Sequence, residues 1–376
     1  MSEHCSHRER FQRLMHYKSV DRGVHWEFGY WDETIDRWHE EGLPRHLDNN
    51  AAIEGYFGVD ARTIVPMRNT NLNPQFEHKI LEEKDGRVIV QLADGTIAEE
   101  IKSGTRTIPH FIDFPVKDRR SWEDYKKRLR IDDPERKIDY KAIANELNAS
   151  ESPVCIDIGS VLGVPRSMIG FERISLMVYD DRDLVQEIID HLTELTMSQL
   201  APALEAGIRV DFGAGWEDIC FKNGPIISPK MFDEMCGPSI QRICDALRSH
   251  GCDIIWTDCD GDINALVPIW LKKGLNCMFP IEVRGGSDPV ALRQEYGKEL
   301  LLIGGFDKFC FDTKESIVAE LKRLTPLIEE GGYIPHCDHR VPASVSYNNY
   351  RFYVREKLQL LGFTKSQIQD IEPLSR

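Results

Sequence analysis

Short apolar runs alternate with longer stretches of helical spacing from about residue 150 onward. The apolar runs predict strands at 154–158, 208–212, 253–256, 277–280, 301–304 and 333–335. Such alternation is typical of parallel βα units. With 62–66 as a seventh strand, the pattern favours an α/β fold of the closed (β/α)8 TIM-barrel type over an open doubly wound sheet.

Two further patterns precede this core. Helical spacing in 8–17 and 31–41 predicts a helical cap formed by residues 1–60. Residues 78–101 alternate around two Asp-Gly turns, which predicts a small antiparallel β insert at the mouth of the barrel. Nothing between these segments has the composition of a linker, so we expect a single domain over residues 1–376.

Composition and charge exclude several classes of function. The 376 residues are 41% hydrophobic and 29% charged, as in soluble globular proteins. Because no apolar run has membrane-spanning length and the N-terminus lacks a signal-peptide pattern, we expect a cytoplasmic protein with no membrane partner. Ten scattered cysteines favour reduced thiols. The net charge of −15 argues against a nucleic-acid partner.

Candidate metal ligands gather where two of the predicted strands end. One cluster occupies 256–262 (WTDCDGD) and the other 335–340 (PHCDHR). Side chains alternate along a strand, so Asp258 and Asp260 should share one face, and Cys337 and His339 should share another. Carboxylate, thiolate and imidazole ligands suit zinc. We therefore predict one zinc ion bound by some subset of these four residues.

Two alternatives to this metal site stay open. Both clusters are also compatible with solvated loops and turn caps. If a bulge reverses the alternation, Cys259 and His336 become the ligands instead. Glu217, which follows a Gly-rich turn and Trp216, is a possible further ligand or acid. Glu282 and Asp307 also follow strands, but helix N-capping is the favoured interpretation for both.

Several segments resemble the uroporphyrinogen decarboxylase superfamily, and within it the corrinoid-dependent methyltransferases. The segments are Arg8-Glu9-Arg10-Phe11, Asp21-Arg22, Ile226–Phe232, Cys259–Ile263, Val341-Pro342 and Asn349-Tyr350. The resemblance implies a (β/α)8 barrel with its site at the mouth, in agreement with the strand pattern.

The resemblance includes two chemistries, which the residues help to separate. Decarboxylation of a multiply carboxylated tetrapyrrole needs an Arg-rich N-terminal segment, because Arg pairs with carboxylates. The matching residues 26–31 (WEFGYW) contain no Arg. Thiol methyltransferases of this superfamily carry His-x-Cys-Gly and a later Cys, which correspond here to Asp258, Asp260 and His339. A metal ion held by oxygen and nitrogen ligands is a stronger Lewis acid for an oxygen substrate than one held by two thiolates.

The chain is therefore most similar to methyltransferases that demethylate aryl methyl ethers. The resemblance implies zinc, a small aromatic substrate, and a corrinoid (cobalamin) carried by a partner protein, since no corrinoid domain is visible in the chain. The expected catalytic residues are Glu217, Asp258 and His339. His110 is a possible proton donor, but a structural role is the favoured interpretation for this residue. The expected substrate-binding aromatics, which are alternatively core residues between cap and barrel, are Trp26, Tyr30, Trp31 and Trp216.

Three other functions remain as alternatives. The first is the opposite half-reaction, from a methylcorrinoid to a folate or thiol carrier. A divergent decarboxylase is the second, and a metal-free scaffold for a corrinoid protein is the third. Metal content together with ether-dependent methylation of cobalt(I) would separate the first expectation from these alternatives.

Overall fold

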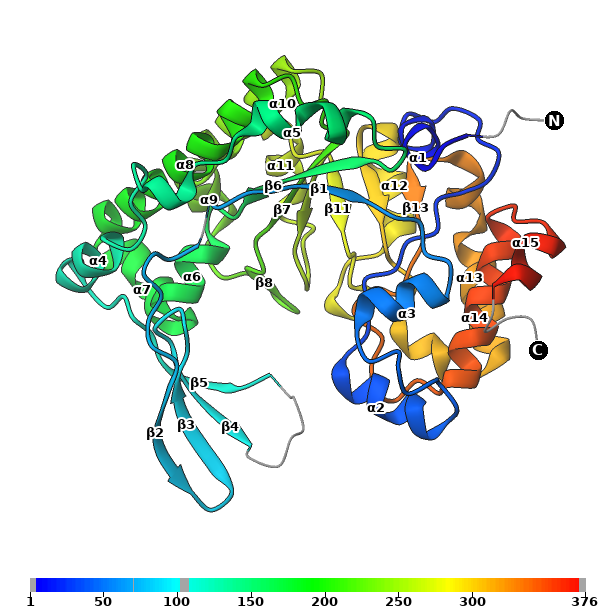
Figure 1. Cartoon of the computed structure of the whole chain (residues 1–376), viewed down its shortest axis with the longest axis horizontal. Helices are drawn as coiled ribbons and strands as arrows, with labels where there is room; N and C mark the ends of the chain where they lie inside the picture. The colour runs from blue at the N-terminus through cyan, green and yellow to red at the C-terminus, as the bar shows by residue number, and fades with distance from the viewer. Residues whose placement is uncertain (1–4, 70, 102–107, 372–376) are drawn as a thin grey trace.

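A parallel β-sheet with helices on its outer face forms the centre of the computed structural model, which describes residues 5–69, 71–101 and 108–371 (Figure 1). Its seven strands pair in the order β1, β6, β7, β10, β11, β12, β13. Their bounds are Thr63–Val65, Val154–Gly159, Phe212–Trp216, Ile255–Asp258, Cys277–Phe279, Leu301–Ile303 and Tyr333–Ile334. Six of the predicted strands are present, and the seventh, predicted at 208–212, lies later in the chain, since β7 begins at Phe212. The predicted α/β fold class is confirmed.

No strand among the described residues pairs β13 with β1. The extended segment from His25 to Trp31 lies in that position instead. On one side the Asp60 N–H donates to the His25 carbonyl (2.8 Å), just before β1. On the other side the Val341 N–H donates to the Gly29 carbonyl (2.9 Å), a few residues after β13. This segment therefore takes the place of an eighth strand without a regular hydrogen-bond ladder.

Alternation along the strands separates the core into two parts. Val154, Ile156 and Ile158 of β6 belong to the main core, between the sheet and the outer helices. The opposite faces of the strands contribute to a second cluster of thirteen buried apolar side chains, which fills the lumen of the barrel. Its aromatic members include Trp26, Phe212, Trp256 and Phe279. The Trp256 and Phe279 rings stack there at 5.3 Å.

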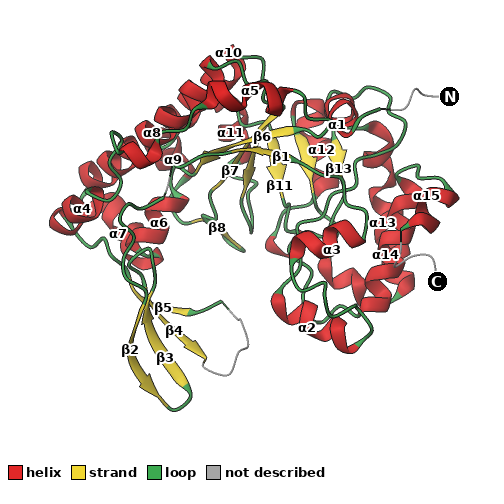
Figure 2. Ribbon diagram, viewed as in Figure 1, coloured by secondary structure: helices red, strands yellow, loops and turns green. Residues whose placement is uncertain are grey.

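The outer layer consists mainly of helices that follow the strands (Figure 2). They include α5 (Tyr140–Asn148), α6 (Gly163–Ile169), α7 (Phe171–Asp180), α8 (Arg182–Glu205), α9 (Pro229–Met235), α10 (Gly237–Ser249), α11 (Val267–Lys273), α12 (Pro289–Tyr296), α13 (Lys314–Glu330), α14 (Tyr347–Leu360) and α15 (Lys365–Asp370). Thr313 and Ser316 form a reciprocal capping box that fixes the start of α13. None of the described helices has the length and apolar character needed to cross a membrane.

The N-terminal region and the insert have the expected kinds of secondary structure. Residues 5–60, the described part of this region, contain three helices, α1 (His7–Met15), α2 (Asp32–Glu40) and α3 (Asn50–Tyr56). The insert is a four-stranded antiparallel sheet that stands apart from the central sheet (Figure 1), formed by β2 (Lys79–Lys84), β3 (Arg87–Gln91), β4 (Ile97–Ile101) and β5 (His110–Asp113). It is longer than predicted, because β5 adds residues beyond 101. His110 lies on this exposed strand beside Glu99, so the suggestion that it is a proton donor at the site is wrong.

Candidate functional site

Three carboxylates and one imidazole gather at the carboxyl ends of β7, β10 and β13. The carboxyl ends of parallel strands meet at one rim of a barrel, so side chains just after them converge. Asp218 follows β7, Asp258 ends β10, and Asp260 follows it. The Asp260 Oδ2 lies 3.2 Å from the His339 Nε2. We call Asp218, Asp258, Asp260 and His339 the rim cluster.

The rim cluster is crowded with negative charge. The partly buried Asp258 carboxylate has no hydrogen bond or ion pair to any other residue that the structure describes. Burial, followed by the charges of Asp218 and Asp260, raises the pKa of Asp258 well above its ordinary value. Burial also raises the pKa of Asp218. The Oδ1 of Asp260 is buried without a partner. Such a set of carboxylates is suited to receive a cation or a proton.

Two aromatic rings hold the imidazole of His339. Trp31 stacks on it at 5.5 Å and 20°, and Phe28 contacts it at 5.5 Å and 59°. The Arg340 N–H donates to the His339 Nδ1 (2.8 Å), so in the neutral ring the proton sits on Nε2, facing Asp260. Of the predicted substrate-binding aromatics, Trp31 therefore borders the rim cluster.

Arginines balance part of this negative charge. The Arg166 Nη2 lies 3.8 Å from the Asp218 Oδ2. The guanidinium of Arg340 lies 5.6 Å from the ring centres of both Phe28 and Trp31. Aromatic faces attract cations, so the two rings hold Arg340 beside the imidazole of His339.

The bend that carries His339 is anchored by Asp338. Its carboxylate accepts hydrogen bonds from the Val283 N–H (3.0 Å) and the Lys308 N–H (3.1 Å). Burial raises the pKa of Asp338 to about 7. Glu282 pairs with Lys308 and accepts from the Gly261 N–H, so it does not cap a helix as the sequence suggested. Asp307 does act as a cap, for the short 3-10 helix Lys308–Asp312.

Cys337 does not lie with His339 as predicted. Its side chain is fully buried in the main core, whereas His339 is partly exposed. The alternation argument failed here because β13 ends at Ile334 and residues 338–340 form a bend. It succeeded at β10, where Cys259 is buried in the main core and faces away from Asp258.

The alternative ligands His336 and Cys259 are also enclosed. His336 packs against Phe279 in the lumen (5.2 Å), and its Nε2 has no partner. Burial lowers the pKa of His336 to about 3. Across the described residues, no three His, Cys, Asp or Glu side chains are already arranged to hold a metal ion.

Glu217 is a structural residue in this fold rather than part of the rim cluster. Its carboxylate accepts from the N–H groups of Val161, Leu162 and Gly163 at 2.8–2.9 Å, and from the Ser160 hydroxyl at 3.1 Å. Carboxylates are favoured at helix N-termini, where backbone N–H groups lack partners. Glu217 thus fixes the start of α6 from the neighbouring strand.

We expect Glu217→Ala to lower the free energy of unfolding by about 3 kcal/mol, because three buried N–H groups lose their acceptor. Urea unfolding measures this loss. Glu172→Ala, at an exposed position in the first turn of α7, is the control and should cost only about 0.5 kcal/mol. Equal losses in the two variants would contradict the structural role of Glu217.

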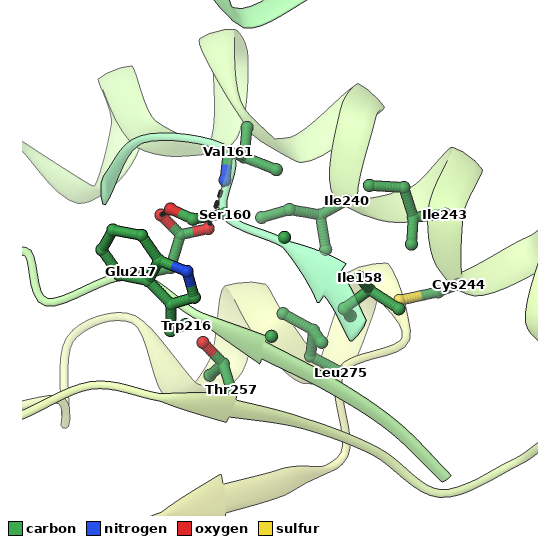
Figure 3. A pocket seen from close by; sticks show the side chains of 12 residues that line it. Ile158, Ser160, Val161, Trp216, Glu217, Ile240, Ile243, Cys244, Thr257 and Leu275 are labelled. Atoms are coloured by element: carbon green, nitrogen blue, oxygen red, sulfur yellow. Dashed lines mark hydrogen bonds between the residues drawn. The ribbon is translucent and has the colours of Figure 1, made fainter. Parts of the chain in front are cut away.

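Trp216 covers a small cavity, which Figure 3 shows together with Glu217 and Ser160. Apolar side chains from β6 and α10 line the other side, and the Thr257 Oγ1 there has no partner. The cavity leaves about 20 Å³ for the centre of a water molecule, which is room for about one water. An aromatic substrate does not fit in this space.

Two other predicted substrate-binding aromatics are core residues. Trp26 is buried in the lumen, where it stacks on Phe11 at 5.2 Å. Tyr30 is completely buried and shares a hydrogen bond with the Tyr350 hydroxyl (2.9 Å). Their assignment to the substrate pocket is corrected: they pack the N-terminal segment against the barrel and α14.

The sequence places Asp218 with Glu217 after a predicted strand, but it assigned no role to Asp218, Arg166 or Arg340. Asp218 was detectable, because alternation from Phe212 through Trp216 places it on the lumen side and Glu217 on the other. The residue adopts a left-handed φ of +47°, which is uncommon outside Gly and is often found at functional sites. Arg166 comes from a segment without a metal or catalytic motif. Arg340 is the last residue of the 335–340 cluster, in which only the Asp, Cys and His side chains are potential metal ligands.

Comparisons with known proteins agree with the fold. The chain matches the family model described as uroporphyrinogen decarboxylase (URO-D) over residues 98–357. A solved structure of a methyltransferase from Methanosarcina mazei superposes with a TM-score of 0.60 at 14% identity, covering 94% of this chain and 99% of the other. At that identity the similarity shows the fold alone.

A second solved structure is a B12-independent methionine synthase from Shewanella sp. W3-18-1. It has a TM-score of 0.43 at 12% identity and covers 94% of this chain and 95% of the other, a similarity too weak to support any conclusion. No curated protein sequence matches the chain significantly.

Proposed function

Because the chain belongs to the uroporphyrinogen decarboxylase family, we propose that it is a methyltransferase of that fold, which moves a methyl group from an aromatic methyl ether to the cobalt of a corrinoid on a partner protein. The observation that carries the proposal is the unpartnered Asp258 in the rim cluster, beside the aromatic pair Phe28 and Trp31. Aromatic side chains next to polar groups suit a substrate with an aromatic ring and a reacting oxygen.

A divalent cation such as zinc fits the donor set of the rim cluster. Asp258, Asp260 and His339 would hold it, since Asp258 lacks a partner and the Asp260 Oδ1 is buried without one. Ligation through the His339 Nε2 requires Nδ1 to carry the proton, so the Arg340 N–H would have to release Nδ1. Cys337 is left out, because its thiol is enclosed in the main core. When bound, the cation would supply Lewis acidity at the ether oxygen.

The overall step balances without an added oxidant. The methyl carbon–oxygen bond breaks and its electron pair stays on the oxygen, while the electron pair of cobalt(I) forms the new carbon–cobalt bond. The phenolate then takes a proton from solvent. In this reaction Phe28 and Trp31 orient the aromatic ring of the substrate, and the rim cluster faces its ether oxygen. Positioning of this kind is a large part of catalysis when a cofactor supplies the nucleophile.

The rim cluster argues against decarboxylation of a multiply carboxylated tetrapyrrole. Three carboxylates at the rim would repel several substrate carboxylates at once, since like charges in a partly buried site are destabilising. Residues 26–31 add no arginine to offset this repulsion.

Anaerobic mixing with free cob(I)alamin tests the proposed function. Zinc-loaded protein is given a panel of methoxylated aromatics, thioethers and methylamines, and loss of the cobalt(I) absorbance is followed. We expect methylation from the aryl ethers alone. Methylation only from a thioether or an amine would contradict the proposed donor, and transfer only from methylcobalamin to a folate or thiol would favour the opposite half-reaction.

A further inference from the structure

We propose that the antiparallel insert is a lid, which closes onto α7 and the short strand β8 (Cys220–Phe221) beside the rim cluster. This inference goes beyond the proposed function, since closure would cover one side of the mouth whatever the reaction there. It comes from a separate core, a hinge of two aromatic contacts, and two apolar walls on either side of one hollow.

The insert has a hydrophobic core of its own. Val88, Val90 and Ala98 form this core, which is separate from the main core and from the lumen cluster of the barrel. Two lengths of chain join the insert to the barrel, one before β2 and one after β5 (Figure 1). Units that have their own core and a small interface move relative to each other by default. The insert can therefore turn as one body.

Each of the two connections carries a phenylalanine that packs on a glycine. Phe76, before β2, lies on Gly95 of the insert and stacks on Tyr125 of the barrel at 5.9 Å. Phe114, after β5, lies on Gly170 between α6 and α7. A Cβ atom on either glycine would overlap the ring. A ring on bare backbone has no interlocking side chain that resists turning, so these two contacts form the hinge.

Aromatic rings stand on both sides of a hollow of about 490 Å³ between the insert and the barrel. Phe111 and Phe114 line its insert side, 6.2 Å apart. Phe171 of α7 lines its barrel side and lies 4.8 Å from Phe221 of β8. Phe111, Phe171 and Phe221 are 44–48% exposed. Closure would remove these rings from water, which is favourable.

A second hollow, of about 380 Å³, indicates the direction of closure. It meets the first at Phe114 and lies between the insert and α4 (Arg119–Lys126). Its other large apolar side chains, Phe76, Ile97 and Tyr125, are already buried or half-buried. Turning toward α4 would therefore remove little apolar surface from water, whereas turning toward α7 covers the exposed rings.

The closed insert would cover the side of the mouth where the rim cluster lies. Phe221 follows Asp218 by three residues, and its carbonyl accepts from the Asp262 N–H (3.0 Å), two residues after Asp260. β8 is thus joined to both of the loops that carry these carboxylates. A lid on β8 would keep water from the rim cluster while it is closed, which is a common use of lids.

Disulfide cross-linking across the hollow tests the closure. Ile112 and Glu172 line opposite walls, and replacing both by Cys leaves the aromatic rings in place. Because a disulfide needs Cα atoms within about 7 Å, its rate of formation reports how often the walls meet. Diamide, which accepts the two thiol hydrogens, is the oxidant, and mass spectrometry of peptides identifies the link. The parent protein, in which eight of ten cysteines are buried, gives the background.

The matched control pair is Ile80→Cys with Glu172→Cys, because Ile80 is exposed on β2, at the far edge of the insert sheet. We expect the Ile112 pair to link at least about tenfold faster than this control. Adding Phe221→Ser should slow the link about fivefold, because closure then buries less apolar surface. Adding Phe309→Ser, at an exposed position after β12, should change the rate less than about twofold.

Three results would overturn the lid. One is an Ile112 pair that links no faster than the Ile80 pair, and another is a rate that Phe221→Ser leaves unchanged. The third is a link between chains, seen as a dimer on a non-reducing gel with a yield that rises with protein concentration; the apolar walls would then join two copies. Thermal melting checks that each variant is folded. The measurement uses neither cobalt nor an ether, so its outcome is separate from that of the proposed function.

Discussion

Replacing Asp258 by Asn is expected to lower methyl transfer from an aryl ether by about 100-fold or more, because the change removes a carboxylate that would hold the cation at the reacting oxygen. The same variant should lose bound zinc, while the side chain keeps nearly the same size. Rates of cobalt(I) loss and metal analysis of the purified protein measure the two effects.

Asp253→Asn is the matched control. Asp253 lies just before β10, on the same stretch of chain as Asp258 but at the opposite end, where it pairs with His16 (2.9 Å). The control should keep its zinc and its rate. If Asp258→Asn retained both, Asp258 would have no part in the site.

The second large effect concerns stability. Lys357 of α14 and Glu27 of the N-terminal segment form an ion pair in which both side chains are completely buried. Lys357 also donates to the carbonyl of Trp26 (3.1 Å). Lys357→Met should lower the free energy of unfolding by about 3–5 kcal/mol, because it leaves a buried carboxylate without its partner. Urea unfolding monitored by circular dichroism measures the loss.

The double variant Glu27→Leu, Lys357→Met should regain part of that stability, since no unpaired charge remains. Lys127→Ala, which removes an exposed pair with Asp124, should cost less than about 1 kcal/mol. A loss in Lys357→Met no greater than in Lys127→Ala would show that the pair does not hold the N-terminal segment in the place of the eighth strand.

Much of the barrel was predictable because its strands are short apolar runs between helical stretches. The same alternation correctly separated Asp258 from Cys259. It failed at Cys337, because an alternation rule holds only within a strand and β13 is two residues long. The N-terminal segment was predicted as part of a helical cap, yet Trp26 fills the lumen. Its extended form depends on partners more than 300 residues away, such as Lys357 and Val341.

The candidate site was predictable only in part for a similar reason. Asp258, Asp260 and His339 lie in short clusters of potential metal ligands, which the sequence shows. The pairing of Arg166 with Asp218 and the contact of Arg340 with Phe28 and Trp31 depend on the fold. Glu217 showed the reverse error: a carboxylate after a Gly-rich turn suggested chemistry, and the neighbouring helix start uses it as a cap.

The most direct test of the central claim is a single-turnover measurement. Zinc-loaded protein is mixed anaerobically with cob(I)alamin and 4-methoxybenzoate, and both the cobalt(I) absorbance and the phenol product are quantified. We predict one 4-hydroxybenzoate for each cobalt methylated, with the rate lost in Asp258→Asn and kept in Asp253→Asn. Unchanged cobalt(I) absorbance, with no phenol formed from any methoxylated aromatic, would contradict the claim that this protein is an aryl ether methyltransferase.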